Sequence, residues 1–202
     1  MTVGLLGGAF DPPHNGHLLL AREARRHFGL RRLVVVVTGS PPHKEVGTPA
    51  ELRFRLAEAA FAGIEGVELS RVELERNGPS YTLDTARWAR SELGEDVVFV
   101  IGADEFVSFL TWHEPEAVLA SVRLGVAARP GYPRARLDAV LERLTRPERV
   151  ELFEISALSV SSTEVRDRVG RGEPIDDLVP PAVASLVTAL GLYRTPPDGG
   201  RG

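Results

Sequence analysis

Short apolar stretches recur along the chain, each bounded by polar or turn-forming residues. Residues 3–6, 33–37 and 97–101 contain no polar side chain. A strand inside a parallel sheet is covered on both faces, so it gives a continuous apolar run instead of an alternating one. These runs therefore predict buried parallel strands. Three more strands are predicted over 67–72, 123–128 and 150–153.

The segments between these strands carry apolar residues at helical spacing. The first predicted helix starts near His14 and ends at Gly29, since glycine commonly closes a helix. Further helices are predicted over 50–62, 82–93, 115–121, 134–144, 162–169 and 182–190, with a short one running to Phe109. Strands alternating with helices are typical of an α/β fold with a doubly wound parallel sheet and right-handed crossovers. We expect one domain over 1–194 and a disordered tail over 195–202.

Composition narrows the class of protein. The chain has 202 residues, 43% of them hydrophobic and 26% charged, which is ordinary globular usage. No segment approaches the roughly 20 apolar residues that span a bilayer, and the start lacks the features of a signal peptide, so we expect a cytoplasmic protein without membrane contact. The net charge of −4 argues against nonspecific nucleic-acid binding. The chain has no cysteine. Its sequence leaves the number of subunits open.

The strongest chemical signal lies in residues 7–17, where the first strand runs through a glycine turn into a helix. Gly7 and Gly8 lack the Cβ atoms that would keep a phosphate away from the backbone, and the following helix starts with unpaired N–H groups. His14 and His17 are three residues apart and share a face in the first helical turn. Both imidazoles can then reach one phosphate chain. The alternative is that proline breaks the chain here and both histidines are surface residues.

Lys44 is the only lysine among 24 basic residues. It follows the apolar run 33–37, and ligands of open α/β sheets bind at the carboxyl ends of strands. A compact ammonium there would neutralise phosphate charge. The alternative is that Lys44 is an ordinary surface residue and that the scarcity of lysine reflects composition alone.

The glycine turn and histidine pair resemble the signature of the H-x-G-H nucleotidyltransferases, which have a Rossmann-like fold and move a nucleotidyl group from a nucleoside triphosphate to an oxygen nucleophile. Later blocks narrow the resemblance to the bacterial nicotinate-nucleotide adenylyltransferases. These blocks are Pro41-Pro42-His43-Lys44, Tyr81-Thr82-Leu83-Asp84-Thr85, Ile101-Gly102-Ala103-Asp104, Trp112, Ala128-Arg129-Pro130-Gly131 and Val160-Ser161-Ser162-Thr163-Glu164-Val165-Arg166. The resemblance extends to about Arg194, with helices at the carboxyl-terminal end.

The implied reaction transfers AMP from ATP to nicotinate mononucleotide, giving nicotinate adenine dinucleotide and pyrophosphate. The resemblance implies that His14, His17 and Lys44 are catalytic, and that magnesium arrives with ATP. The implied ATP-binding residues are Gly7, Gly8, Phe10, His14, His17, Gly102, Asp104, Ser161, Ser162 and Arg166. The implied residues around nicotinate mononucleotide are Lys44, Tyr81, Thr82, Asp84, Trp112 and Arg129.

Several of these residues also have a purely structural interpretation. Asp84 and Asp104 fit the first turn of a helix, where its dipole favours carboxylates. Trp112 fits a core position, and Arg129 fits a surface turn. We assign Trp88 to packing and give His27 and His113 no functional role.

Three other functions compete with this interpretation. Phosphopantetheine adenylyltransferase shares the H-x-G-H chemistry but lacks the Tyr81–Thr85 block. An NAD-dependent dehydrogenase requires G-x-G-x-x-G after the first strand, and this chain does not supply it. A noncatalytic nucleotide sensor would keep the glycine turn but lose the histidine pair or the acceptor pocket.

Overall fold

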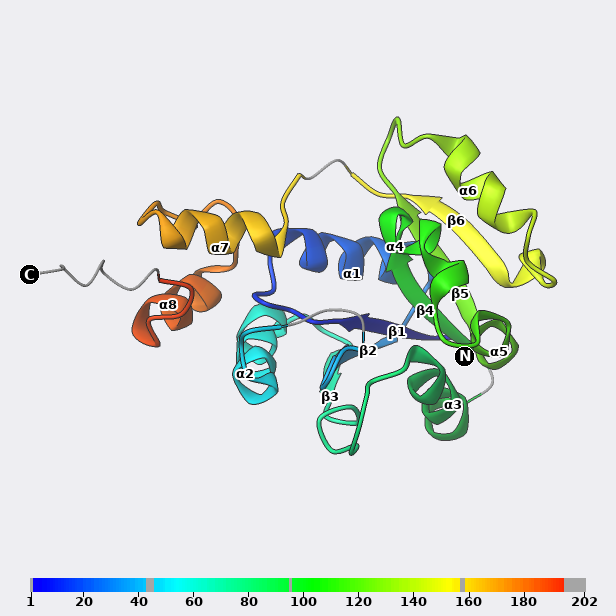
Figure 1. Ribbon diagram of the computed structural model, residues 1–202, viewed down its shortest axis with the longest axis horizontal. Helices are drawn as coiled ribbons and strands as arrows, with labels where there is room; N and C mark the ends of the chain where they lie inside the picture. Colours follow the sequence, from blue (N-terminus) through cyan, green and yellow to red (C-terminus); the bar gives the residue numbers. More distant parts are fainter. Residues whose placement is uncertain (1, 43–45, 95, 157–158, 195–202) are drawn as a thin grey trace, which may run out of the picture.

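The computed structural model describes residues 2–42, 46–94, 96–156 and 159–194. Within them a parallel sheet of six strands has the order β3-β2-β1-β4-β5-β6 (Figure 1). The strands are β1 (Val3–Gly8), β2 (Arg32–Val37), β3 (Val67–Ser70), β4 (Val97–Gly102), β5 (Arg123–Ala128) and β6 (Val150–Glu154). The predicted α/β class and doubly wound parallel sheet are confirmed.

Helices cover both faces of this sheet. They are α1 (Asn15–Phe28), α2 (Ala50–Phe61), α3 (Thr82–Leu93), α4 (Ala103–Val107), α5 (Pro115–Ser121), α6 (Arg134–Leu141), α7 (Ser162–Gly170) and α8 (Pro181–Ala189), with short 3₁₀ turns η1 (Phe109–Thr111) and η2 (Pro147–Arg149). Figure 1 shows α7 and α8 at one end of the molecule, beyond the start of α1. No helix of the described ranges is long and apolar enough to cross a bilayer.

Two apolar layers fill the space between sheet and helices. Leu33, Val35 and Val37 of β2 pack with α1, α2, α7 and α8, whereas Val34 and Val36 pack with α3 to α6. Successive side chains of a strand point to opposite faces. This alternation explains why the strand had to be apolar throughout.

Most predicted boundaries hold to within two residues, and two of the differences have clear local reasons. The helix predicted over 134–144 ends at Leu141, because Arg143 and Leu144 form i→i+3 bonds to Val140 and Leu141 at 3.0 and 3.1 Å. The tighter turn still buries Leu144. The strand predicted over 67–72 ends at Ser70, whose hydroxyl accepts the backbone N–H of Val72 at 3.3 Å as the chain leaves the sheet.

The order of the strands places the site. Beginning at β1, the chain builds β2 and β3 on one side and then returns to build β4, β5 and β6 on the other. Ligands of open parallel sheets bind at such a reversal, beyond the carboxyl ends of the strands. Here those ends are Gly8 of β1 and Gly102 of β4.

Candidate active site

The turn after β1 is shaped by a buried aromatic ring. Phe10 has φ of 51°, a left-handed conformation that is rare for a residue with a side chain, and it is 1% exposed. A Cβ at Gly8 would lie 3.1 Å from the Phe10 ring, so glycine is needed where the ring folds back. Phe10 meets His17 edge-on at 4.9 Å between ring centroids. Phe10 therefore supports the His17 ring, and its predicted contact with ATP stays a prediction.

His14 and His17 form a stacked pair at the start of α1. His14 is the N-cap residue, and the two ring centroids are 3.7 Å apart with the planes inclined by 26°. The backbone N–H of His14 donates to Nδ1 of His17 at 3.1 Å. Because Nδ1 of His17 is an acceptor, a neutral His17 carries its proton on Nε2. The Nε2–H of His17 is thus a donor whose orientation is fixed by the backbone of His14.

Burial keeps both imidazoles neutral at pH 7. It lowers the pKa of His14 to about 4. The pKa of His17 is well below its ordinary value because the ring is buried and because a charged His14 would lie beside it. A polyphosphate brought against the pair would raise both pKa values, since an opposite charge favours the protonated form. The pair can therefore donate to phosphate as neutral rings or take up a proton when phosphate arrives.

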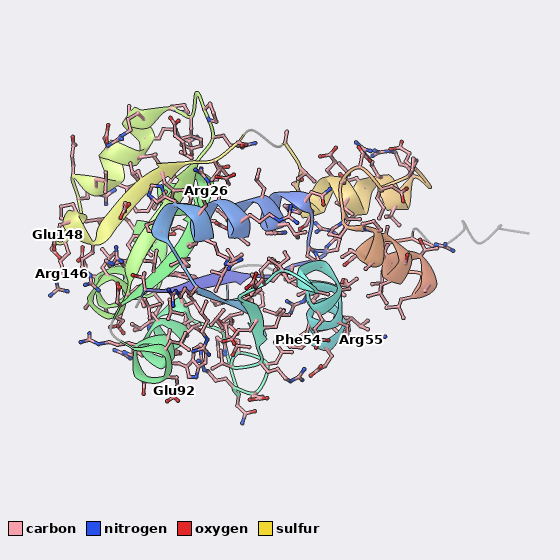
Figure 2. The ribbon with its side chains drawn as sticks, turned by 180° about the vertical axis from the view of Figure 1, so that it is seen from behind. Arg26, Phe54, Arg55, Glu92, Arg146 and Glu148 are labelled. Carbon is pink, nitrogen blue, oxygen red and sulfur yellow. The ribbon has the colours of Figure 1, made fainter. Side chains whose placement is uncertain are left out.

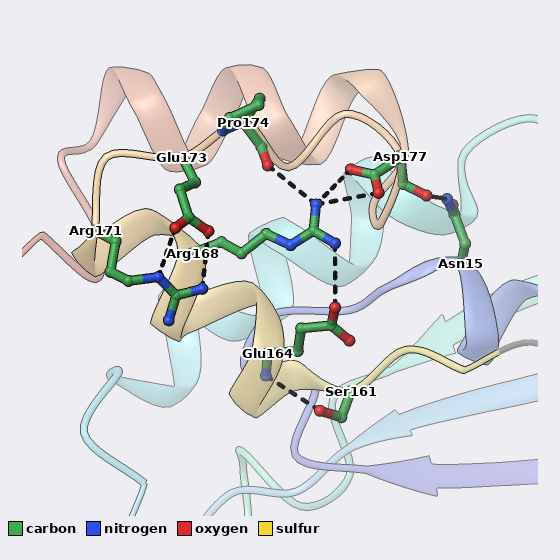
Figure 3. Close-up of polar contacts among 8 residues, drawn as sticks. All are labelled: Asn15, Ser161, Glu164, Arg168, Arg171, Glu173, Pro174 and Asp177. Atoms are coloured by element: carbon green, nitrogen blue, oxygen red, sulfur yellow. Dashed lines mark hydrogen bonds and ion pairs between the residues drawn. The ribbon is translucent and has the colours of Figure 1, made fainter.

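The carboxyl-terminal helices hold the start of α1. Asn15 donates its backbone N–H to the Leu178 carbonyl at 2.9 Å and its side-chain amide to the Asp177 carbonyl at 3.1 Å. Arg168 of α7 bonds the Asp177 carboxylate at 3.0 Å and Glu164 at 3.2 Å (Figure 3). The sequence alone does not show this link between the histidine turn and α7–α8.

One cavity of about 460 Å³ opens beside the histidine pair, and we name it the histidine cavity. Its lining residues are His14, Gly16, His17, Leu20, Gly102, Ala103, Asp104, Glu105, Ala127, Arg129, Tyr132, Ile155, Ser159, Val160, Ser161 and Glu164. Five predicted ATP-binding residues thus meet here: both histidines, Gly102, Asp104 and Ser161.

Arg129 lies in this histidine cavity and not beside the predicted acceptor residues. Its Nη2 is 3.7 Å from Oδ2 of Asp104, and the Tyr132 hydroxyl donates to Oδ1 of the same carboxylate at 3.0 Å. Arg129 follows β5, which lies beyond β4 and away from β2 and β3. Its predicted contact with nicotinate mononucleotide stays a prediction.

A second cavity, of about 410 Å³, opens at the ends of β1 and β2, and we name it the aromatic cavity. It is lined by Gly7, Gly8, Ala9, Thr38, Pro41, Pro42, Glu73, Ser80, Tyr81, Thr82, Thr85, Phe99, Ile101, Glu105, Ser108, Trp112 and His113. The predicted acceptor residues Tyr81, Thr82 and Trp112 come together here. Asp84 lies in the first turn of α3 outside this lining.

Three lining residues were not anticipated from the sequence. His113 stacks against Tyr81 with ring centroids 4.4 Å apart, and its position next to Trp112 was the available clue. Glu73 is buried and accepts the Thr85 hydroxyl at 2.5 Å; burial raises the pKa of its carboxyl. Glu105 lines both cavities. Neither glutamate belongs to a motif, so the sequence carries no signal for either of them.

Ser161 caps the start of α7, where its hydroxyl accepts the Glu164 N–H at 3.1 Å. It combines this structural role with a place in the histidine cavity. A capping serine therefore does not exclude a ligand contact, and the predicted one stays a prediction.

Ser162 and Arg166 lie behind the turn instead of inside the histidine cavity. The Ser162 hydroxyl donates to the Pro12 carbonyl at 2.8 Å, and Nη1 of Arg166 donates to the Asp11 carbonyl at 2.7 Å. Arg166 lines a separate cavity of about 420 Å³ together with Tyr193. These donors satisfy carbonyls in a turn without regular structure. In this arrangement both residues hold the histidine turn, and their predicted phosphate contacts remain untested.

Lys44 lies outside the described residues, although Pro41 and Pro42 before it line the aromatic cavity. Over the described part of the chain, His, Asp and Glu side chains form no group of three that could hold a metal ion.

The two cavities give the site its chemical capability. Glu105 lines both cavities, and the neutral donor pair lines only one of them. Two ligands could therefore lie next to each other, one against imidazoles and one against aromatic rings. Donors held in this way stabilise charge that develops on a phosphate during transfer.

Comparison with known proteins gives a consistent family. Residues 5–168 match the model of a family described as cytidylyltransferase-like. A relative from Thermus thermophilus named "Probable nicotinate-nucleotide adenylyltransferase" is 43% identical over 96% of this chain and 100% of its own length. A Rubrobacter xylanophilus relative of the same name is 38% identical over 96% and 92%.

Solved structures share the fold. A Plasmodium falciparum nicotinic acid mononucleotide adenylyltransferase complexed with NaAD superposes with a TM-score of 0.77. The match covers 95% of this chain and 97% of the other at 18% identity.

Proposed function

The chain belongs to the nicotinate-nucleotide adenylyltransferase family, within the cytidylyltransferase-like proteins, and from this premise we propose how its own residues carry out adenylyl transfer. The reaction joins AMP from ATP to the 5′-phosphate of nicotinate mononucleotide, a step of NAD biosynthesis. The observation that supports this function best is the pair of cavities that share Glu105 in their linings, with two neutral imidazoles in only one of them.

In the proposed reaction an oxygen of the acceptor phosphate attacks the α-phosphorus of ATP. The bond from that phosphorus to the bridging oxygen breaks, and pyrophosphate leaves with the electron pair. The acceptor is already ionised at neutral pH, so no protein nucleophile is required. Catalysis then consists of positioning and charge stabilisation.

ATP is assigned to the histidine cavity, with Nε2–H of His17 and the ring of His14 against the phosphates. The backbone at Gly102 and the carboxylate of Asp104 suit the ribose, since acidic residues accept ribose hydroxyls in related folds. Arg129, paired with Asp104 in the free protein, would change partner when ATP binds. ATP enters with a divalent cation, which we expect to be magnesium.

Nicotinate mononucleotide is assigned to the aromatic cavity. Trp112 offers a flat face to the pyridine ring, and the first backbone N–H groups of α3, at Thr82 and Leu83, precede the first bond of that helix, from Asp84 to Tyr81. Such donors suit a carboxylate. Lys44 is proposed, from the sequence alone, to neutralise the acceptor phosphate or the leaving pyrophosphate.

The test is pyrophosphate release from ATP with nicotinate mononucleotide, nicotinamide mononucleotide and phosphopantetheine as competing acceptors. We expect release with the first acceptor at the highest efficiency. Release with phosphopantetheine alone would assign the chain to the other H-x-G-H reaction, and no release with any acceptor would indicate a nucleotide sensor. Cytoplasmic location and the number of subunits stay predictions.

A further inference from the structure

Arg53 of α2 is 2% exposed and directs its guanidinium at backbone carbonyls. Its Nε donates to the Thr48 carbonyl at 3.0 Å. Nη1 donates to Ala9 at 2.8 Å and to Thr38 at 2.6 Å, and Nη2 donates to Gly39 at 3.0 Å. Arginine is seldom fully buried unless its donors are paired. Here one planar group satisfies four carbonyls from two connections, the one between β1 and α1 and the one between β2 and α2.

These carbonyls lie where β1 and β2 separate. The last pair of the ladder is Gly8 with Val37, followed by a 2.9 Å bond from Thr38 N–H to the Gly8 carbonyl. Beyond it the strands diverge, so Ala9 and Thr38 cannot bond each other as sheet neighbours do. The guanidinium of Arg53 lies at this point and donates to the carbonyls of both strand ends.

The loop after β2 is held from its other side by the entry to α3. The Ser80 N–H donates to the Ser40 carbonyl at 2.8 Å, and the Ser40 N–H donates to the Ser80 hydroxyl at 3.0 Å. At Gly39 a Cβ would collide with the Glu73 backbone carbonyl. The backbone of this loop is therefore fixed by Arg53 on one side and by Ser80 and Glu73 on the other.

Both loops held by Arg53 belong to the site. Ala9 and Thr38 line the aromatic cavity, and the chain continues from Ala9 to His14. The spacing of these loops determines how far the acceptor cavity lies from the histidine pair. Displacements of about 1 Å between reacting groups can reduce a rate on the order of 100-fold.

We propose that Arg53 is a positioning residue for adenylyl transfer, which fixes the histidine turn and the β2 exit loop at the separation that brings the acceptor phosphate to ATP. This inference rests on the proposed function. Arg53 contacts neither ligand; it acts through the backbone of Ala9, Thr38 and Gly39. Lysine keeps the charge but has three donors on one nitrogen and no planar fork, so it cannot span the same carbonyls.

The experiment compares Arg53→Lys with Arg55→Met. Arg55 lies on the same helix and is exposed, which makes it a matched control (Figure 2). We expect Arg53→Lys to lower kcat/KM for nicotinate mononucleotide by about 10- to 100-fold. Its Kd for ATP, measured by calorimetry, should change by less than about threefold, because ATP occupies the other cavity. Arg55→Met should match the unmodified protein in both quantities.

Ser80→Ala tests the same loop without altering Arg53. It removes the acceptor of the Ser40 N–H, so we expect a smaller loss of kcat/KM and again little change in the Kd for ATP. Combined with Arg53→Lys, the two losses should be less than multiplicative because both act through one loop. If Arg53→Lys does not fold, a normal rate for Ser80→Ala overturns the proposal.

Two further results would also overturn it. If Arg53→Lys folds and has a normal rate but a lower Tm, Arg53 contributes to stability alone. Equal losses in the Kd for ATP and in kcat/KM would indicate general loosening. Failure of the proposed function is distinct, because the unmodified protein would then release no pyrophosphate with nicotinate mononucleotide.

Discussion

The histidine cavity and the aromatic cavity share Glu105 in their linings, yet their chemistry is differently distributed. In the histidine cavity, the two imidazoles come from one helical turn, where His14 and His17 stack at 3.7 Å. In the aromatic cavity, Tyr81, Trp112 and His113 come from separate segments and offer surfaces instead of one focused donor. Loss of a single residue should therefore reduce turnover in the first cavity and binding in the second.

The strongest test of this difference is His17→Ala. We expect turnover to fall about 100-fold or more with a modest change in ATP affinity, because a transition-state donor is lost. Steady-state rates and calorimetric titration with ATP measure the two effects. His27→Ala is the matched control, since His27 is on the same helix but pairs with Glu151 at 2.8 Å, away from both cavities. Near-normal turnover of folded His17→Ala would contradict the assignment.

Choice of acceptor tests the aromatic cavity. We expect nicotinate mononucleotide to be preferred over nicotinamide mononucleotide by about 10- to 100-fold in kcat/KM. A carboxamide would point its NH₂ at the backbone donors of Thr82 and Leu83, and an unmatched buried donor costs about 1–3 kcal/mol. Competition between the two acceptors gives the ratio directly. Equal efficiencies would exclude this model of the cavity even if adenylyl transfer is observed.

Trp112→Ala separates binding from selection within the aromatic cavity. Loss of the flat face should raise KM for both mononucleotides in similar proportion, by up to about 10-fold, and leave the Kd for ATP nearly unchanged. Trp88→Phe is the control, because Trp88 packs against the apolar layer under α3 to α6, as predicted. A change of acceptor preference in Trp112→Ala would show that the indole itself distinguishes acid from amide.

The smallest expected effect is an opposite pH dependence of stability in the two cavities. The folded pKa of His14 is about 4, below its ordinary 6.5, so the unfolded chain binds more protons between these values and stability falls as the pH drops through this window. At pH 5.5 this amounts to about 1 kcal/mol. In thermal unfolding, the Tm of His14→Gln should fall less between pH 7.5 and pH 5 than the Tm of the unmodified protein.

Glu73 should shift stability in the other direction. Burial raises its folded pKa, so the folded state binds the extra proton and stability falls as the pH rises from the ordinary glutamate value through the raised one. Glu73→Gln keeps an acceptor for the Thr85 hydroxyl and should raise Tm more at pH 7.5 than at pH 5. An equal change in Tm at both pH values would contradict a titrating Glu73.

Much of the fold was predictable because its signals are local. The apolar run 33–37 indicates a strand covered on both faces, and Gly29, which closes α1 with φ of 61°, marks a boundary through its own conformational freedom. The stacked histidines were predictable for the same reason, since a spacing of three residues brings side chains together in one helical turn.

Other features depended on which segments the sheet brought together. Arg129 lies beside Asp104 because β5 is next to β4. Of the four carbonyls that the Arg53 guanidinium bonds, those of Ala9, Thr38 and Gly39 come from two strand exits that meet only in the folded sheet. The sequence by itself determined the elements and the reactive turn, through short-range periodicity and local backbone preference. Tertiary structure alone decided the two cavities and the partners of the buried arginine, because strand order sets which distant loops become neighbours.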